Sequence, residues 1–344
     1  FNLTIEIGPR SKWGSKPIPR GKGFYFFISA EVNTALKDEH VNDYALYVEN
    51  FVERYDNDGI GDMPGLKAPI TRYEVLSEAQ WLPEKSPYWR GTVDEYIQVL
   101  KISYKAAKKA NSNTKIILSG FAFWDLFDKG PLTDQQIEQK IQESIDYYPP
   151  EDARKSASAD LRHVLAFNER ILQEKDYFDE AEFHLLSNYT AIEGTVDWIR
   201  RRMRKNGYEK PIWAGDAGAT IQIPSHNRVG RWAIFNTVNL FYPPLYDDGD
   251  KIFEVLTSKK NKYGYSYEKV SKWVYKEQVN YLAKSLVIEM EQGLKGTNIF
   301  TWLDADPTFW MPGPFKNWQI QGLREGNYSR LEVGKPKPVF YTYK

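Results

Sequence analysis

The chain has 344 residues, of which 42% are hydrophobic and 27% charged, as is typical of a globular protein with a large core. It contains no cysteine, which excludes disulfides, a thiol nucleophile and cysteine-bound metals. Basic and acidic residues both number 46, so the chain lacks the basic excess of a nucleic-acid-binding protein, and no apolar run reaches the ~18 residues of a membrane span.

Strand-like and helix-like segments alternate along the chain. Short, largely apolar segments predict strands over 1–7, 24–28, 70–76, 115–121, 181–186, 211–219 and 297–303. Apolar residues with helical spacing predict helices over 41–55, 93–110 and 195–206, a helical region over 134–174, and helical stretches near 228–241 and 267–292. Such alternation is typical of parallel βαβ units and places the chain in the α/β class.

The expected architecture is a (β/α)8 TIM barrel, because a closed barrel has eight β/α units and about seven are visible in this sequence. This hypothesis requires that the first units are missing or degenerate. An open, doubly wound sheet is the alternative. It is disfavoured because no glycine-rich phosphate loop follows the first strand. No linker or internal repeat divides the chain, so one domain over 1–344 is expected.

Acidic residues follow two of the predicted strands. Glu78 comes after the strand that ends at Leu76, and Asp216 lies near the end of the strand that begins at Pro211. In a parallel barrel, residues at the carboxyl ends of strands meet at one face. Two carboxyl groups there are the minimum for glycoside cleavage, one as acid and one as nucleophile or base. A helix cap or a solvated loop residue is the simpler alternative for each acid.

Several segments carry a resemblance to a known family. They read FVERYDNDGIGDMPG over 51–65, YEVLSEA over 73–79, FDEAEFH over 178–184, KPIWAGDAG over 210–218 and FTW over 300–302. In this order they resemble the fourth, sixth, seventh and eighth strand regions of clan A glycoside hydrolases, which include family 5 and family 39 enzymes. The resemblance implies a TIM barrel in which 1–7 is about the third strand.

The same resemblance assigns roles to individual residues. It implies that Glu78 is the acid/base, that Asp216 occupies the nucleophile position, and that His184 and Trp302 shape the subsite for the cleaved sugar. Three departures bear on activity: Asp216 replaces a glutamate, Ser77 and Ala79 replace an asparagine and a proline, and Leu186 stands where a tyrosine is usual. The shorter acid predicts carboxyl groups near 6.5 Å apart, between the roughly 5–5.5 Å of retaining and 6.5–9.5 Å of inverting enzymes.

Further sugar contacts are predicted at strand ends. The aromatic content is 15%, and flat rings stack on the apolar faces of sugars. Trp81 and Trp124 are candidates beside Trp302, with core packing as the alternative, and Asp304 is a candidate for sugar hydroxyl groups.

A metal is not expected. Asp56, Asp58 and Asp62 with Gly59 resemble a calcium loop but lack its bidentate glutamate. No His-Glu-x-x-His run indicates catalytic zinc, and no cofactor is expected.

The sequence therefore predicts a glycoside hydrolase that cleaves a β-linked poly- or oligosaccharide, with no nucleic-acid partner and no membrane span. A secreted or extracellular protein is expected, with its export signal absent from this sequence or already removed. Two alternatives stay open: a barrel that has lost catalysis and binds carbohydrate or serves a structural role, and an unrelated α/β enzyme.

Overall fold

The computed structural model describes residues 3–17, 33–83, 86, 88–123, 126–147, 151–185, 189–217, 249–299, 324–327 and 332–343. The chain forms two compact units. The first comprises Phe1–Ala122, Ala159–Phe183 and Ile199–Trp213, and the second comprises Phe123–Ser158, His184–Trp198 and Ala214–Lys344. The expectation of one domain over 1–344 stays a prediction.

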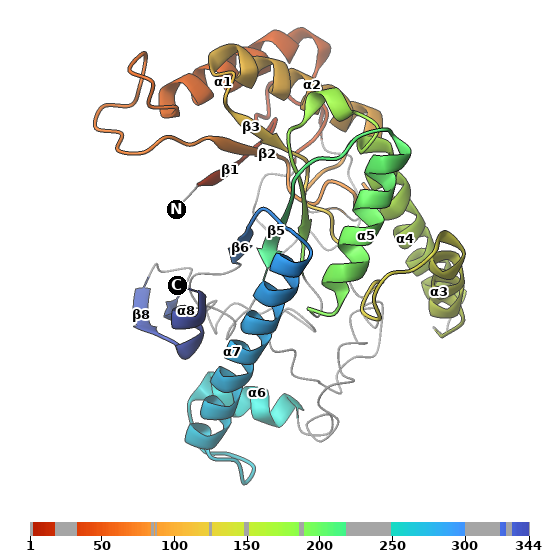
Figure 1. Ribbon diagram of the computed structural model, residues 1–344, viewed down its shortest axis with the longest axis vertical. Coiled ribbons are helices and arrows are strands. Elements are labelled where there is room, and N and C mark those ends of the chain that lie inside the picture. Colours follow the sequence, from red (N-terminus) through yellow and green to blue (C-terminus); the bar gives the residue numbers. More distant parts are fainter. Residues whose placement is uncertain are drawn as a thin grey trace. The chain divides into compact units, whose positions relative to one another are not determined.

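The first unit is built on parallel strands. Strands β1 (Thr4–Ile7), β2 (Arg72–Val75) and β3 (Lys115–Ile117) lie side by side in that order (Figure 1). Parallel bridges from β3 and the segment after it reach Glu180, directly before β4 (Ala181–His184), and Phe183 within that strand. All four residues of β2 are buried, as expected for a parallel strand that is covered on both faces.

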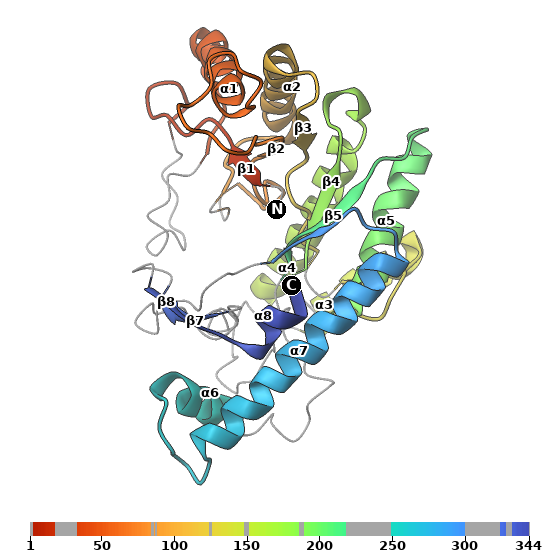
Figure 2. The ribbon, with the colours of Figure 1, turned by 60° about the vertical axis from the view of Figure 1, so that its left-hand side comes forward.

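Helices α1 (Val41–Tyr55) and α2 (Val93–Ala110) pack against one another in this unit (Figures 1 and 2). Helix α1 buries Tyr44, Val48 and Val52, which recur every four residues and so share one face. Helix α2 begins with a capping box in which Thr92 and Glu95 satisfy each other's backbone N–H groups. Both helices were predicted with these bounds. Short 3-10 helices at η1 (Asp38–His40) and η2 (Lys175–Tyr177) precede α1 and β4.

Four elements cross from one unit to the other along the chain: β4, β5 (Ile212–Ala217), α4 (Glu151–Ile171) and α5 (Ala191–Lys205). In the second unit, β5 pairs in parallel with β6 (Thr297–Ile299), with an irregularity in the register between Ala214 and Ala217. The remaining strands, β7 (Arg324–Asn327) and β8 (Glu332–Pro336), form an antiparallel pair.

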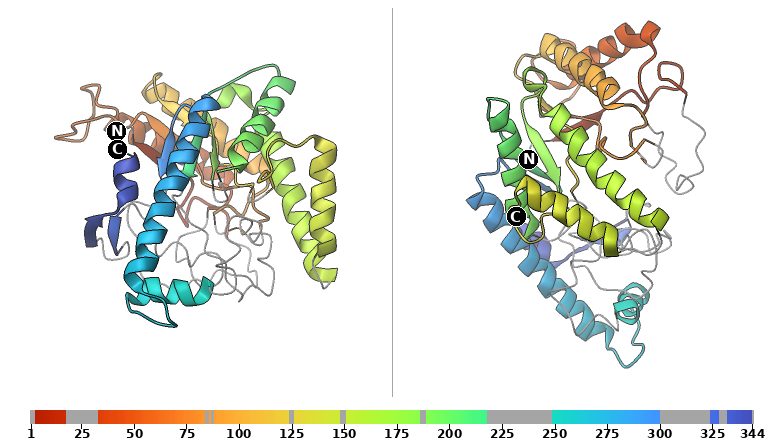
Figure 3. Two further views of the ribbon diagram at one scale, coloured as in Figure 1. Left: turned by 60° about the horizontal axis from the view of Figure 1, so that its bottom comes forward. Right: turned by 90° about the vertical axis from the view of Figure 1, so that its right-hand side faces the viewer.

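The helices of the second unit are α3 (Asp134–Tyr147), α6 (Gly249–Ser258), α7 (Tyr267–Glu291) and α8 (Pro338–Tyr343). Helices α6 and α7 share an apolar cluster of Ile252, Val255, Leu256, Val270 and Val274. Helix α8 lies beside α7 (Figure 3). Val339 of α8 packs there against Leu282 of α7.

The predicted α/β class and parallel strands are confirmed, whereas closure into a complete barrel stays a prediction. A helical region was predicted over 134–174, and the structure forms two helices there, α3 and α4, separated by a segment that contains Pro149 and Pro150. Helix α6 and the β7–β8 pair were not predicted. The predicted strand 24–28 and helix 228–241 lie outside the described residues. Within the described part of the chain, no helix is long and apolar enough to cross a bilayer.

Candidate active site

Glu78 lies three residues after β2, in a loop with unusual backbone geometry. The φ angles of Leu76 and Glu78 are +59° and +45°, in the left-handed region that costs a residue with a side chain roughly 1–2 kcal/mol. Leu76 is fully buried, and its N–H donates to the carbonyl of Ile7 at 3.0 Å. The close approach of this leucine explains Gly8, because a Cβ there would collide with Cδ2 of Leu76.

Hydrogen bonds hold the loop around Glu78 to β3 and α2. The N–H of Ala79 donates to Oγ of Ser119 at 2.8 Å, and the N–H of Ser119 donates to the hydroxyl of Tyr96 at 3.0 Å. That hydroxyl in turn donates to the carbonyl of Val75 at 3.1 Å. The end of β2 and the loop after it are therefore fixed by a connected set of buried polar groups.

The carboxyl group of Glu78 has a specific partner. Nε1 of Trp81 donates to Oε2 of Glu78 at 2.9 Å, and Glu78 is only 6% exposed. Trp81 is a candidate sugar contact from sequence, and that role stays a prediction, but this bond gives its indole a second role in orienting the carboxyl group. Ser77 is partly exposed, between the two residues with positive φ.

In the second unit, Asp216 and His184 lie close together. Asp216 is the penultimate residue of β5, where the pairing with β6 shifts register, and its φ angle is +36°. Such an irregularity redirects a side chain relative to a regular strand. Oδ2 of Asp216 lies 3.7 Å from Nδ1 of His184; the carboxyl side chain is 43% exposed, and the imidazole 1%. The N–H of Leu185 donates to the carbonyl of Gly215 at 3.4 Å, which joins the two strand ends.

The structure thus groups Glu78 with Ser77 and Trp81, and Asp216 with His184. The convergence of Glu78 and Asp216 on one substrate stays a prediction. Trp124, Trp302 and Asp304 lie outside the described residues.

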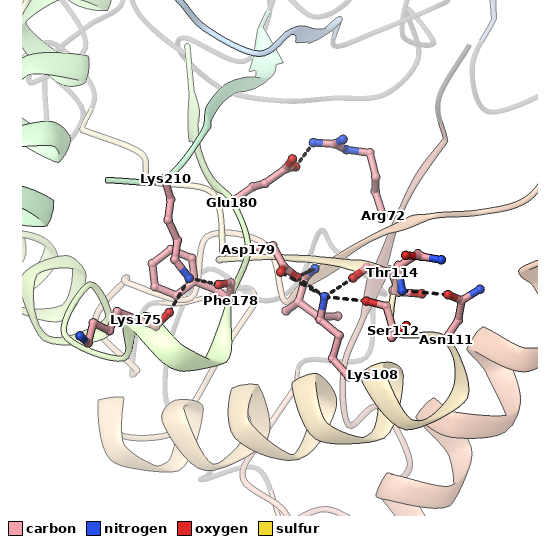
Figure 4. Close-up of polar contacts among 12 residues, drawn as sticks. Arg72, Lys108, Asn111, Ser112, Thr114, Lys175, Phe178, Asp179, Glu180 and Lys210 are labelled. Carbon is pink, nitrogen blue, oxygen red and sulfur yellow. Dashed lines mark hydrogen bonds and ion pairs between the residues drawn. The ribbon is translucent and has the colours of Figure 1, made fainter. Parts of the chain in front are cut away.

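Buried charges inside the first unit were missed from sequence. Arg72 and Glu74 alternate along β2 and so share one face, as do Glu180 and Glu182 at β4. Arg72 forms an ion pair with Glu180 (Figure 4), its guanidinium lies 3.7 Å from the ring centre of Trp213, and burial lowers the pKa of Arg72 to about 10. The available signal was a charged residue at every second position of otherwise apolar strands.

Glu74 and Glu182 are both buried, and their carboxyl oxygens lie within 4.8 Å of one another. The N–H of Gly120 donates to Oε1 of Glu74 at 3.0 Å. These oxygens belong to the ligand types that hard cations prefer. The expectation that the chain holds no metal stays a prediction.

The three aspartates of the turn after α1 also lie within 4.8 Å of one another, as the resemblance to a calcium loop suggested. The carboxylate of Asp62 accepts the N–H groups of Asn57 and Gly59, each at 2.7 Å, and that of Asp58 accepts the N–H of Ile60 at 2.8 Å. These bonds fix the shape of the turn from within.

Polar contacts at the amino-terminal ends of the strands, opposite the ends that lead to Glu78, have a structural role (Figure 4). Nζ of Lys108 lies 2.9 Å from Asp179, whose carboxylate also accepts the N–H of Ile116 at 2.8 Å. Nζ of Lys210 donates to the carbonyls of Lys175 and Phe178. The contacts of Asp179 tie the beginning of β3 to the segment before β4, and those of Lys210 tie the segment before β5 to it as well. Both lie away from the strand end that leads to Glu78.

No protein-family model matches the chain, and no curated protein sequence matches it. Solved structures resemble it. A monomeric beta-xylosidase from Caulobacter crescentus CB15 is 12% identical with a TM-score of 0.50, and the match covers 98% of this chain and 51% of that one. A glucosidase from Croceicoccus marinus is 13% identical with a TM-score of 0.47 over 88% and 45% of the two chains. A GH53 catalytic domain from Ignisphaera aggregans is 15% identical with a TM-score of 0.45 over 100% and 73%.

The chain spans about half the length of the glucosidase and the xylosidase that it matches. At such identities the similarity concerns the fold alone, and the match to the xylosidase, at a TM-score of 0.50, is the one on which we rely. The chain therefore has a glycosidase-like fold.

Proposed function

We propose that the protein is a glycoside hydrolase that cleaves a β-linked poly- or oligosaccharide, with Glu78 as general acid/base and Asp216 as nucleophile or water-activating base. One observation supports this above all others. The two acids that the sequence singles out both follow or end a parallel strand, and both have positive φ angles, of +45° and +36°. Backbone strain of this kind gathers at functional sites, where it aims a side chain.

Each acid has surroundings that suit its role. Glu78 delivers its proton to the glycosidic oxygen as the bond between that oxygen and the anomeric carbon breaks, and the N–H of Trp81 keeps the carboxyl group oriented. The exposed carboxyl group of Asp216 attacks the anomeric carbon or removes a proton from water. The buried imidazole of His184 positions Asp216. Ser77, Trp124, Trp302 and Asp304 complete the proposed sugar contacts, and the protein acts outside the cell.

The test is the hydrolysis of a panel of aryl β-glycosides by the wild type, Glu78→Gln and Asp216→Asn. Loss of a general acid costs about 10²–10⁴ in rate, so both variants should lose at least about a hundredfold. Glu78→Gln should lose less on a substrate whose leaving phenol needs no proton. Exposed Glu39 supplies the control Glu39→Gln, which should act as the wild type does. Equal turnover by all four proteins contradicts the assigned roles.

Binding of carbohydrate without cleavage is the second candidate function. It is favoured by the replacement of the expected glutamate by Asp216 and of the expected asparagine by Ser77, because a misplacement of about 1 Å can cost about a hundredfold in rate. Calorimetry that shows oligosaccharide binding, with no product after long incubation, would support this second function. Turnover that disappears in Glu78→Gln would exclude it.

A further inference from the structure

Trp13 presents its indole to solvent. Trp13 is 59% exposed, whereas Trp89 and Trp198 are fully buried. The residue lies in the turn over 12–14, which follows β1 in the first unit. Neither the predicted sugar contacts nor the proposed catalytic roles include it.

The turn that carries Trp13 is held firmly. Nζ of Lys37 donates to the carbonyl of Trp13 at 2.6 Å, and the N–H of Lys37 donates to the carbonyl of Gly14 at 3.0 Å. The N–H of Ser15 donates to the carbonyl of Ser11 at 3.0 Å. An exposed ring on a braced turn loses little conformational freedom when a ligand covers it, which favours binding.

Hydrogen-bonding groups border the indole. The rings of Trp13 and His40 meet edge to face, with centres 4.7 Å apart and planes at 87°. Nδ1 of His40 donates to the carboxylate of Asp43 at 2.8 Å, and Asp43 is exposed. A flat apolar face beside an imidazole and a carboxylate matches a sugar ring, which has apolar C–H faces and a rim of hydroxyl groups. Ser11 and the exposed Lys12 precede this ring in the chain and add polar groups beside it.

The topology places this ring on the same side of the sheet as Glu78. Strands β1 and β2 are parallel neighbours, so the loops that follow them leave the same edge of the sheet. Trp13 lies in the loop after β1, and Glu78 lies in the loop after β2. An ion pair of 2.7 Å between Lys16 and Glu95 also joins the loop after β1 to the start of α2, which follows the Glu78 loop.

We propose that Trp13, with His40 and Asp43, forms a distal subsite that binds a sugar unit of a polysaccharide whose chain extends to Glu78. The inference rests on the proposed function for its substrate class. It adds a binding position outside the catalytic residues, and it makes the protein bind polymers better than short glycosides.

The test measures binding and not turnover. Native electrophoresis through gels that contain soluble β-1,4-xylan, mixed-linkage β-glucan or β-1,4-galactan gives a dissociation constant for each polymer. Glu78→Gln is the background, so that the polymer in the gel stays intact. Three further substitutions are made in this Glu78→Gln background: Trp13→Ala, Trp13→Phe and Leu46→Ala. Leu46 lies on α1 and is 56% exposed, so Leu46→Ala controls for the loss of exposed apolar surface. Thermal unfolding checks that each variant is folded.

With a polymer that retards the background protein, Trp13→Ala should raise the dissociation constant about tenfold, as expected from uncovering about 50 Å² of apolar contact. Trp13→Phe should raise it less, and Leu46→Ala should leave it unchanged. Equal retardation of all the variants overturns the subsite, and so does a failure of every polymer to retard the background protein. If Trp13→Ala weakens binding but the wild type cleaves no glycoside, the subsite stands and the proposed hydrolase activity does not.

Discussion

Glu289 should make the stability of the protein depend on pH. This acid lies in the last turn of α7 and is only 5% exposed. Burial raises the pKa of Glu289 from 4.5 to about 7, and a contact with the hydroxyl of Thr297 on β6 opposes part of the rise. The native protein therefore holds a proton on this group that the unfolded chain releases at a lower pH.

The sign and size of the effect follow from this difference. Between about pH 4.5 and pH 7 the native state binds more protons than the unfolded state, so the free energy of unfolding falls as the pH rises, and it levels off above pH 7. A difference of about 2.5 pKa units corresponds to at most about 3 kcal/mol. Glu289→Gln resembles the protonated acid at every pH. We expect it to match the wild type near pH 4.5 and to be more stable by about 2–3 kcal/mol near pH 8.

Urea denaturation of the wild type and Glu289→Gln at about pH 4.5, 6 and 8 measures this difference. Glu291→Gln, at an exposed position of the same helix, is the matched control and should follow the wild type at each pH. If the wild type and Glu289→Gln differ by the same amount at all three pH values, burial does not hold a proton on Glu289 and the reasoning is refuted.

Three other changes test the site and the fold. Asp216→Glu extends the acid by about 1–1.5 Å and should give products of retained anomeric configuration by NMR, whereas inverted products would contradict the geometry inferred from the shorter side chain. Arg72→Met leaves the carboxylate of Glu180 buried without its cation and should lower the free energy of unfolding, measured by urea denaturation, by about 3–5 kcal/mol. Adding Glu180→Leu to this variant should restore most of the loss, and an equal loss in the double variant argues against the pairing. Thr92→Ala removes the cap of α2 and should cost about 1 kcal/mol, with Thr92→Ser close to the wild type; unchanged stability of Thr92→Ala would show that the cap contributes nothing.

The helices of the first unit were predictable because their limits are local. Helix α1 ends at Tyr55, and in the turn that follows, the carboxylate of Asp62 accepts the backbone N–H of Asn57. Helix α2 starts directly after its N-cap, Thr92. The division of the predicted helical region 134–174 into α3 and α4 also has a local signal, because Pro149 and Pro150 stand between the two helices and proline does not continue a helix.

The pairing of buried charges could not be predicted in the same way. Alternation along β2 shows that Arg72 and Glu74 share a face, but Glu180, the partner of Arg72, lies more than a hundred residues further along the chain. Only the order of β1, β2, β3 and the start of β4 brings Glu180 to Arg72. The same limit applies to the Trp13 turn, because its bracing by Lys37 depends on a contact between loops.

For the candidate site, the sequence proposes the two acids and the structure shows the surroundings of each. Glu78 and Asp216 are candidates because both come at the ends of predicted parallel strands and because the flanking segments resemble those of clan A glycoside hydrolases. The bond from Trp81 to Glu78, and the approach of His184 to Asp216, depend on loop and strand-end geometry that residue types alone do not determine.

The strained backbone at Glu78 and Asp216 is a second reason, independent of the sequence pattern, to propose that both are functional residues. Six non-glycine residues among those described have positive φ angles, and Asn57, Lys259 and Tyr263 lie in turns beyond helices. Residues with side chains adopt such angles in only a few per cent of cases, and aspartate several-fold more often, so a glutamate and an aspartate chosen beforehand from sequence would both do so by chance on the order of a few times in a thousand. Each conformation costs about 1 kcal/mol or more, and hydrogen bonds hold the Glu78 loop in place against that cost. A loop that needed only to connect β2 to α2 would place asparagine or glycine at such positions, so the retention of Glu78 there argues for a requirement on where its carboxyl group points.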